Sequence, residues 1–255
     1  MSKTSLYWEN KKERAKRAER HTKEMEAKYY REILESVKKT KTYSPDSEFN
    51  KKGEPKQPET MFLNTDTVTA LFARGYGKVA VLNFASYKNP GGMFLKGSKA
   101  QEECLCHSSF LYNVLRNCKE YYQWNNDNKN RALYLDRALY NRNVRFFSED
   151  ESLLCDVITC AAPNWSAAQK FGNATKEEND KLLKDRIRFI KNIAEDNRDD
   201  VIILGAWGAG VFGQDAAVVA KYMNEIFSET TIKRVVFAVP GNDENYTAFK
   251  NTFEK

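Results

Sequence analysis

The sequence has no long hydrophobic run and very few histidines. No apolar stretch reaches roughly 18 residues, so no segment is predicted to cross a membrane as a helix. Residues 1–12 (MSKTSLYWENKK) lack the apolar centre of a secretory signal, and we expect none. His107 lies beside Cys104 and Cys106, but a zinc site would need a second ligand pair, and His21 is the only other histidine. We therefore expect neither a metal nor another cofactor.

The cysteines are odd in number and cannot all pair within the chain. They fall in apparent helices and strands, where reduced thiols are the simplest interpretation. The sequence therefore predicts a cytoplasmic protein. The five are Cys104, Cys106, Cys118, Cys155 and Cys160.

The positive charge of the chain is placed at its N-terminus. Residues 1–42 hold 13 Lys and Arg against 7 Asp and Glu, which accounts for the whole formal net charge of +6. A neutral remainder argues against specific or broad binding of duplex nucleic acid by the body. The N-terminal segment could touch a polyanion, but charges on a solvated helix face are the simpler interpretation.

The spacing of apolar residues predicts an N-terminal extension followed by an α/β body. Residues 9–39 are rich in Lys, Arg, Glu and Ala without Pro or Gly, which predicts one helix whose second half packs on the body. Residues 43–60 carry three prolines and few apolar residues, which indicates a connector. We therefore divide the chain into an extension, 1–60, and a body, 61–255.

Within the body, buried strands alternate with amphipathic helices. The segments VAVLNFA, VRFF, LLCDVITCAA, VIILGAW and RVVFAVP read as strands, and AQEECLCHSSFLYNVLRN, EENDKLLKDRIRFIKNIAED and DAAVVAKYMNEIF as helices. A short strand and helix precede them at MFLN and TDTVTALFARG. Residues 119–142 show no clear pattern. The alternation predicts an α/β sandwich with a largely parallel sheet.

Two glycine-rich turns follow strands. Gly91 and Gly92 lie where backbone amides could approach an anion, and Glu102 and Glu103 begin the helix that follows. The second turn, GAWGAGVFG at 205–213, contains GxGxxG between a strand and a helix. That pattern alone also fits an NAD-dependent oxidoreductase, although the turn lies late in the chain and that reading leaves the two glutamates unexplained.

The segments around these turns carry a family resemblance. LNFASYKNPGG, AQEECLCHSSFLY, DVITCAAPN, LGAWGAGVFG and VVFAV occur in the order in which they occur in microbial-type poly(ADP-ribose) glycohydrolases, a branch of the macrodomain superfamily. The sequence resembles that family over roughly residues 60–240. The resemblance implies a macrodomain-like three-layer sandwich with a mixed, largely parallel sheet between helices. It also implies hydrolysis of ribose–ribose O-glycosidic bonds, releasing ADP-ribose from chain ends. The implied ligand is ADP-ribose or poly(ADP-ribose), including polymer on ADP-ribosylated proteins.

The resemblance also implies residue roles. Glu103 would be the acid and base, with Glu102 as its ribose-binding partner. Two adjacent, partly desolvated carboxyls should raise at least one pKa. An aromatic face should hold adenine, for which Phe237 and Tyr246 are candidates. The expected ligand-binding residues are Asn83, Ser86, Gly91, Gly92, Met93, Gln101, Gly208, Ala209, Gly210, Val211, Phe212 and Phe237.

Met93 departs from the pattern, because the family carries a third glycine there. A non-glycine residue would be strained if the position needed positive φ. The side chain could instead be accommodated in the core. The alternative function that follows from this departure is an ADP-ribose-binding reader with weak or no hydrolysis.

Overall fold

The computed structural model describes residues 10–50, 53–74 and 77–254. Residue 9, where the predicted N-terminal helix begins, lies outside them, as do residues 51–52 of the predicted connector. A seven-stranded sheet in the order β1-β4-β5-β3-β6-β7-β2 organises the chain. The strands are β1 (Lys41–Tyr43), β2 (Glu59–Leu63), β3 (Val79–Phe84), β4 (Ala138–Phe147), β5 (Ser152–Cys160), β6 (Val201–Leu204) and β7 (Arg234–Ala238).

The sheet is mixed and mostly parallel. β5, β3, β6, β7 and β2 run parallel to one another, whereas β4 is antiparallel to both β5 and β1. β3 is buried along nearly its whole length, as expected for a parallel strand covered on both faces. The predicted α/β class and largely parallel sheet are confirmed.

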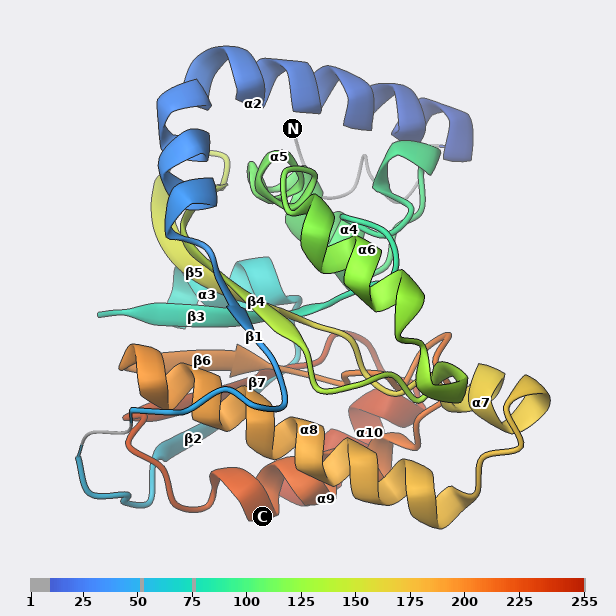
Figure 1. The fold of residues 1–255 in the computed structure, drawn as a ribbon. Coiled ribbons are helices and arrows are strands. Elements are labelled where there is room, and N and C mark those ends of the chain that lie inside the picture. The colour runs from blue at the N-terminus through green and yellow to red at the C-terminus, as the bar shows by residue number, and fades with distance from the viewer. Residues whose placement is uncertain (1–9, 51–52, 75–76, 255) are drawn as a thin grey trace.

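Helices cover both faces of the sheet, which gives three layers (Figure 1). One face carries α2, α3, α4, α5 and α6, and the other carries α8, α9 and α10. Each face has its own apolar cluster. The helices are α2 (Lys11–Lys39), α3 (Thr67–Arg74), η1 (Phe94–Lys96), α4 (Gln101–His107), α5 (Leu111–Leu115), α6 (Lys119–Asp127), η2 (Asn130–Ala132), α7 (Trp165–Phe171), α8 (Lys176–Asn197), α9 (Ala216–Phe227) and α10 (Glu244–Phe253).

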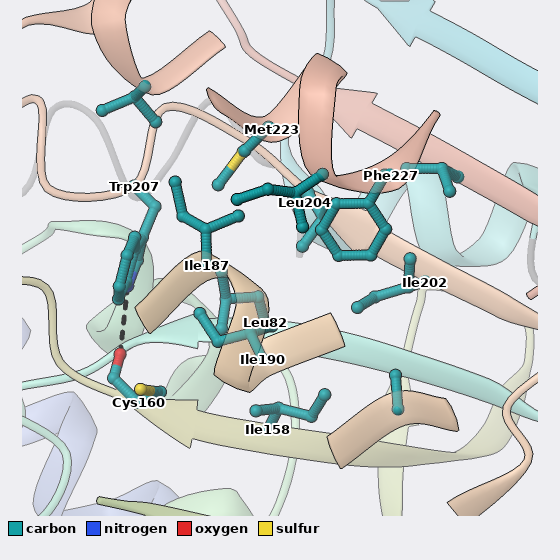
Figure 2. Close-up of a cluster of buried hydrophobic side chains, with 14 of the residues drawn as sticks. Leu82, Ile158, Cys160, Ile187, Ile190, Ile202, Leu204, Trp207, Met223 and Phe227 are labelled. Carbon is teal, nitrogen blue, oxygen red and sulfur yellow. Dashed lines mark hydrogen bonds between the residues drawn. The ribbon is translucent and has the colours of Figure 1, made fainter. Parts of the chain in front are cut away.

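The cluster under α8 and α9 also anchors the second glycine turn. Figure 2 shows Ile187, Met223 and Phe227 packed against the sheet, with Trp207 at one edge of the cluster. Trp207 is fully buried, and its indole Nε1 donates to the carbonyl of Cys160 at 3.0 Å. The turn after β6 therefore has a fixed base.

The N-terminal helix is confirmed over Lys11–Lys39, and it is less regular than its sequence suggests. The side chain of Asn10 caps α2 by accepting from the amide of Glu13, and the helix kinks at Tyr29. Its buried residues include Ala18 and Ile33, so both halves pack on the body. The extension then contributes β1 to the sheet, and the proposed boundary at residue 60 falls inside β2. The division into two parts stays a prediction.

Several elements differ from the sequence-based expectations. The single helix expected over residues 100–117 is two helices, α4 and α5, because the chain turns at Ser108–Phe110, where Ser109 bridges to Phe146. The unassigned stretch 119–142 forms α6, η2 and the start of β4. The helices α7 and α10 were not predicted from the sequence. In the part of the chain that the structure describes, no helix is long and apolar enough to span a membrane.

Candidate active site

The carboxyl end of β3 and the start of α4 are tied together by one side chain. Gln101 accepts a hydrogen bond from the amide of Phe84 at 2.9 Å and donates to the carbonyl of Leu82 at 2.8 Å. Gln101 thus completes the backbone pairing of β3 and fixes the first turn of α4. It places the next two residues, Glu102 and Glu103, beneath the glycine turn. A direct ligand contact of Gln101 stays a prediction.

Glu102 is buried and held by several donors. Its Oε1 accepts from Nδ2 of Asn83 at 3.1 Å, and its Oε2 accepts from the amide of Ser86 at 2.7 Å. Burial raises the pKa of Glu102 to about 8, and the neighbouring Glu103 carboxylate raises it too, while the bonds from Ser86 and Asn83 oppose the rise. The predicted rise in one pKa is therefore found, and it falls on Glu102.

Glu103 has one oxygen engaged and one without a partner. Its Oε1 accepts from the amide of Met93 at 2.8 Å. Its buried Oε2 has no hydrogen-bond partner among the described residues. Both oxygens of Glu102 already accept N–H bonds, so Oε2 of Glu103 is the one carboxyl oxygen of the two residues that has no donor among the described residues.

Gly92 permits this arrangement. Its φ is +61°, and a Cβ placed on it would lie 2.6 Å from Oε1 of Glu103 and 2.9 Å from Oε2 of Glu102. Gly91 also has a positive φ, +64°, and a Cβ there would meet Tyr112 at 2.7 Å. Both glycines are required, by conformation and by space.

Met93 adopts an ordinary backbone conformation. Its φ is −109°, so the strain that a positive φ would have caused is absent. The Met93 side chain is 39% exposed, and the side chain of Leu95 nearby is exposed too, so Met93 does not point into the core. Of the two alternatives that the sequence left open for Met93, strain at a positive φ and a side chain in the core, the structure shows neither.

Asn83 and Ser86 lie at the same end of β3. The side chain of Asn83 is fully buried and donates to Glu102 and to Oγ1 of Thr159. The Ser86 hydroxyl accepts from the amides of Lys88 and Asn89 and shapes the turn. Their contact with a ribose stays a prediction, because what the structure shows is support of Glu102.

The second glycine turn is held at its base. Gly208 and Gly213 have φ of +80° and +70°, and a Cβ on either would collide with the segment that follows β5. Gln214, just after the turn, donates to the carbonyl of Pro163 at 2.8 Å and to Oδ1 of Asn179 at 2.7 Å. Tight packing and hydrogen bonds therefore fix the base of the turn.

The tip of this turn is open. A Cβ on Gly210 would have no described atom within 4 Å, and Val211 is 89% exposed. The amides of Gly210, Val211 and Phe212 donate no hydrogen bond to the described chain. Consecutive unused amides on a fixed turn are suited to an anion. Ala209 is engaged, because its amide donates to the carbonyl of Ala206 at 3.2 Å.

An aromatic stack joins the two turns. Tyr87, from the first turn, stacks on Tyr134 with centroids 4.0 Å apart. Phe212, from the second, meets Tyr134 edge-on at 6.1 Å. Sequence reasoning missed Tyr134 because it lies in the unassigned stretch and has a positive φ of 62°. The stack fixes the separation of the two turns.

A cavity of about 290 Å³ lies at the carboxyl ends of β3, β6 and β7. Its lining includes Phe84, Gln101, Asp66, Ala206, Val239 and Asn245. Phe237 does not reach it: this residue is 1% exposed, and its ring stacks on Phe253 at 3.9 Å. The expectation that Phe237 offers a face to adenine is wrong, because inward positions of β7 build the core. Tyr246 packs on Phe62 at 5.4 Å.

Metal-binding side chains do not gather in the described residues. No group of three or more His, Cys, Asp and Glu is placed to hold an ion there. All five cysteines lie in the described part and are free thiols. Burial raises the pKa of Cys106, the cysteine nearest the glycine turn, well above its usual value.

Solved structures of known proteins share this fold. A family model described as microbial-type PARG, catalytic domain, matches residues 8–149. The poly(ADP-ribose) glycohydrolase (PARG) of Thermomonospora curvata superposes with a TM-score of 0.84 at 27% identity, over 94% of this chain and 99% of that one. The same enzyme bound to the inhibitor ADP-HPD gives 0.81 at the same identity and coverage. PARG of Deinococcus radiodurans in complex with ADP-ribose gives 0.75 at 28% identity, over 87% and 97%.

A comparison with curated protein sequences returned no match. The family match spans more than half of the chain, and it includes the first glycine turn and both glutamates. It gives no support to the oxidoreductase interpretation of the second turn. The chain belongs to the family of microbial-type PARG catalytic domains.

Proposed function

We propose that the protein hydrolyses the ribose–ribose bond of poly(ADP-ribose) and releases ADP-ribose, with Glu103 as acid and base. The observation that carries this proposal is the pairing of an engaged Oε1 with a buried, unpartnered Oε2 on Glu103. A fixed carboxyl with one free oxygen can hold a proton and aim it. The neighbouring Glu102 is fixed in turn by Asn83 and Ser86.

The reaction then takes two proton transfers. Glu103 protonates the leaving ribose oxygen as the bond to the anomeric carbon breaks and an oxocarbenium-like centre forms. The Glu103 carboxylate next takes a proton from a water, whose oxygen bonds to that carbon. The products are a free ribose hydroxyl and ADP-ribose, and Glu103 is reprotonated. Adjacent carboxyls cannot flank the sugar from opposite sides, so Glu102 positions a ribose hydroxyl instead.

The two glycine turns bind the diphosphate. The amides of Gly210, Val211 and Phe212 face it from one side, and the turn at Gly91 and Gly92 from the other. The support is the open tip of the second turn with its unused amides. At the first turn the amide of Gly92 donates to the carbonyl of Asn89 and that of Met93 to Glu103, so this turn borders the diphosphate without those two donors. Ala209 and Gly208 hold the turn in shape rather than contact the ligand.

Adenine occupies the cavity at the ends of β3, β6 and β7. Phe84 offers it an aromatic face, and Asp66 and Asn245 offer polar groups for its edge. This replaces the role that sequence reasoning gave to Phe237. The cavity volume of about 290 Å³ is at the lower end of the range for small-molecule sites and fits one base better than a whole nucleotide.

The substrate class includes polymer carried on ADP-ribosylated proteins, because the chain end is the part that must enter the cleft. We place the reaction in a reducing compartment such as the cytoplasm. The support for that placement is the set of five free thiols, of which Cys106, Cys155 and Cys160 are buried.

The test compares ADP-ribose release from poly(ADP-ribose) by the wild type and by Glu103→Gln. The amide keeps the bond from Met93 but cannot cycle a proton, so kcat should fall by at least about 100-fold. Glu120→Gln, the same change on the exposed face of α6, should leave kcat unaltered. No release by the wild type, or equal release by wild type and Glu103→Gln, would reject the proposal.

A further inference from the structure

The positive charge of α2 is confined to its N-terminal half. Residues 11–23 contain seven Lys and Arg and two Glu, whereas residues 24–39 contain four of each. The body of the protein is formally neutral, so this half-helix is the main concentration of charge in the sequence. Its position relative to the active site therefore bears on what binds there.

The C-terminal half of α2 uses its acids to dock on the body. Glu26 pairs with Arg116 at 2.5 Å, and Glu32 pairs with Arg145 at 2.8 Å. These pairs and the buried Ile33 fix that half beside α5 and β4. Counted over residues 24–39 as a whole, the four Lys and Arg are matched by four Glu, so this half carries no formal net charge of its own.

The N-terminal half presents an exposed basic face. Lys12, Lys16, Arg20 and Lys23 are spaced by four, four and three residues, which places them on one side of the helix. All four are exposed, and the face extends over about 17 Å at 1.5 Å per residue. Lys16 also pairs with Glu13 at 3.2 Å, an exposed contact that a stronger anion can replace.

The same half-helix rests on the catalytic turn. Arg14 donates through Nε to the carbonyl of Gly97 at 2.7 Å, and a Cβ on Gly97 would lie 2.0 Å from the carbonyl oxygen of Lys11. Gly97 ends η1, which begins directly after Met93, the residue bonded to Glu103. Figure 1 shows η1 beneath the N-terminal end of α2. The N-terminal half of α2 therefore packs on the segment that follows the catalytic turn through Lys11 and Arg14, while the basic face lies on the exposed side of the helix.

We infer that this basic face binds the diphosphates of further ADP-ribose units in the polymer whose end occupies the cleft. Lys96 and Lys99, exposed on the turn between, extend it toward the site. The inference rests on the proposed function, and it adds a second contact region for the same substrate. Cleavage at Glu103 acts on the end of the polymer, so the remaining units, with their diphosphates, lie outside the site. The nearest strongly positive surface attracts them.

Nucleic acid is the competing polyanion. The position of the basic half-helix favours poly(ADP-ribose), because this half packs on η1, which begins directly after the residue bonded to Glu103. A polymer held at both places gains from effective concentration, which a nucleic acid bound to the helix alone does not.

The experiment uses full-length protein carrying Glu103→Gln, so that bound polymer is not consumed. Lys12→Glu, Lys16→Glu and Lys23→Glu are combined in one variant. The control combines Lys28→Glu, Arg31→Glu and Lys38→Glu on the neutral half of the same helix. Fluorescence anisotropy with labelled long poly(ADP-ribose) and with a two-unit oligomer gives Kd at several salt concentrations. We expect the first variant to bind long polymer about tenfold more weakly, with a shallower salt dependence.

The control should change Kd for the long polymer less than threefold, and neither triple variant should change binding of the oligomer. Equal weakening by both triple variants would overturn the inference, as would an unchanged Kd for the long polymer. Single-stranded DNA with the same number of phosphates should displace the polymer less well than unlabelled polymer does, and equal displacement would also overturn it. Hydrolysis of the two-unit oligomer by the wild type reports on the proposed function separately.

Discussion

The backbone amide of Met93 donates a hydrogen bond of 2.8 Å to Oε1 of Glu103. Met93 therefore supports the acid through its main chain, while its side chain is 39% exposed. Any residue with an N–H and the observed φ of −109° can make this bond. The family's glycine at this position is thus dispensable for holding the carboxyl.

Met93→Ala should consequently retain hydrolysis. The substitution keeps the amide and the backbone conformation, so kcat on poly(ADP-ribose) is expected to stay within about threefold of the wild type. Met93→Gly should behave alike, apart from added freedom in the turn. The alternative is that Met93 has made the protein a reader. In that case the wild type would bind ADP-ribose without turnover, and Met93→Gly would gain hydrolysis. Steady-state release of ADP-ribose and calorimetric binding distinguish the two cases.

Gly92→Ala should abolish activity. The added Cβ would lie 2.6 Å from Oε1 of Glu103 at a φ of +61°, so either the turn or the carboxyl must move. We expect kcat/KM to fall by at least about 100-fold, because a displacement near 1 Å has that effect on positioned groups. The left-handed backbone also becomes costlier by about 1 kcal/mol, which should lower Tm by about 2 °C.

Gly210→Ala is the matched comparison for Gly92→Ala. Its φ is not in the left-handed region, and the new Cβ would meet no described atom within 4 Å. Tm should stay unchanged, and any effect should appear in KM for the substrate, since the methyl group points into the space assigned to the diphosphate. A large fall in Tm for Gly210→Ala would show that the tip of the turn is less open than its contacts indicate.

The rate should fall on the alkaline side. Burial raises the pKa of Glu102 to about 8, so this carboxyl keeps its proton below that pH and loses it above. The plot of kcat/KM against pH should therefore decline above about pH 8. Asn83→Ala removes a donor that favours the charged carboxylate, so the decline should move to higher pH. A decline that moved to lower pH in this variant would contradict the assignment.

Much of this fold could be predicted from local patterns. The strands at 79–85 and 201–204 are nearly unbroken apolar runs, and both carry glycine turns at their carboxyl ends. In a parallel sheet such ends meet at one edge, so the pairing of the two turns followed from the sequence. The position of the two adjacent glutamates in the first turn of α4 was also predicted correctly.

The parts that could not be predicted depend on contacts distant in sequence. The stack of Tyr87 on Tyr134 joins a turn to a stretch with three successive left-handed residues at 130–132, which no periodicity reveals. Phe237 and Phe84 are both aromatic residues on parallel strands, and only the packing of α10 shows that the first is buried while the second lines the cavity. The pKa of Glu102 likewise depends on its burial and on which N–H donors reach its oxygens.

A buried cluster at the opposite end of the sheet should make stability depend on pH. The Tyr140 hydroxyl lies 2.6 Å from both Oδ2 of Asp156 and Oδ1 of Asp199, and its single hydrogen cannot serve two ionised carboxylates. The Lys78 ammonium lies 3.5 Å from Asp156 and 3.6 Å from Asp199. Burial raises the pKa of Asp199 to about 7, with Asp156 adding to the rise and Tyr140 and Lys78 opposing it.

Because the folded pKa of Asp199 lies above its unfolded value of 3.8, the folded state holds a proton that the unfolded state has released. Its contribution to stability is complete below about pH 4 and is lost as the pH rises to about 7. Between pH 5 and pH 8 this loss amounts to about 3 kcal/mol. Asp199→Asn keeps an acceptor for Tyr140 and removes the titration. Urea unfolding at pH 5 and pH 8 should therefore show a smaller decrease in the free energy of unfolding for the variant than for the wild type. An equal decrease would show that Asp199 is not the group whose titration causes it.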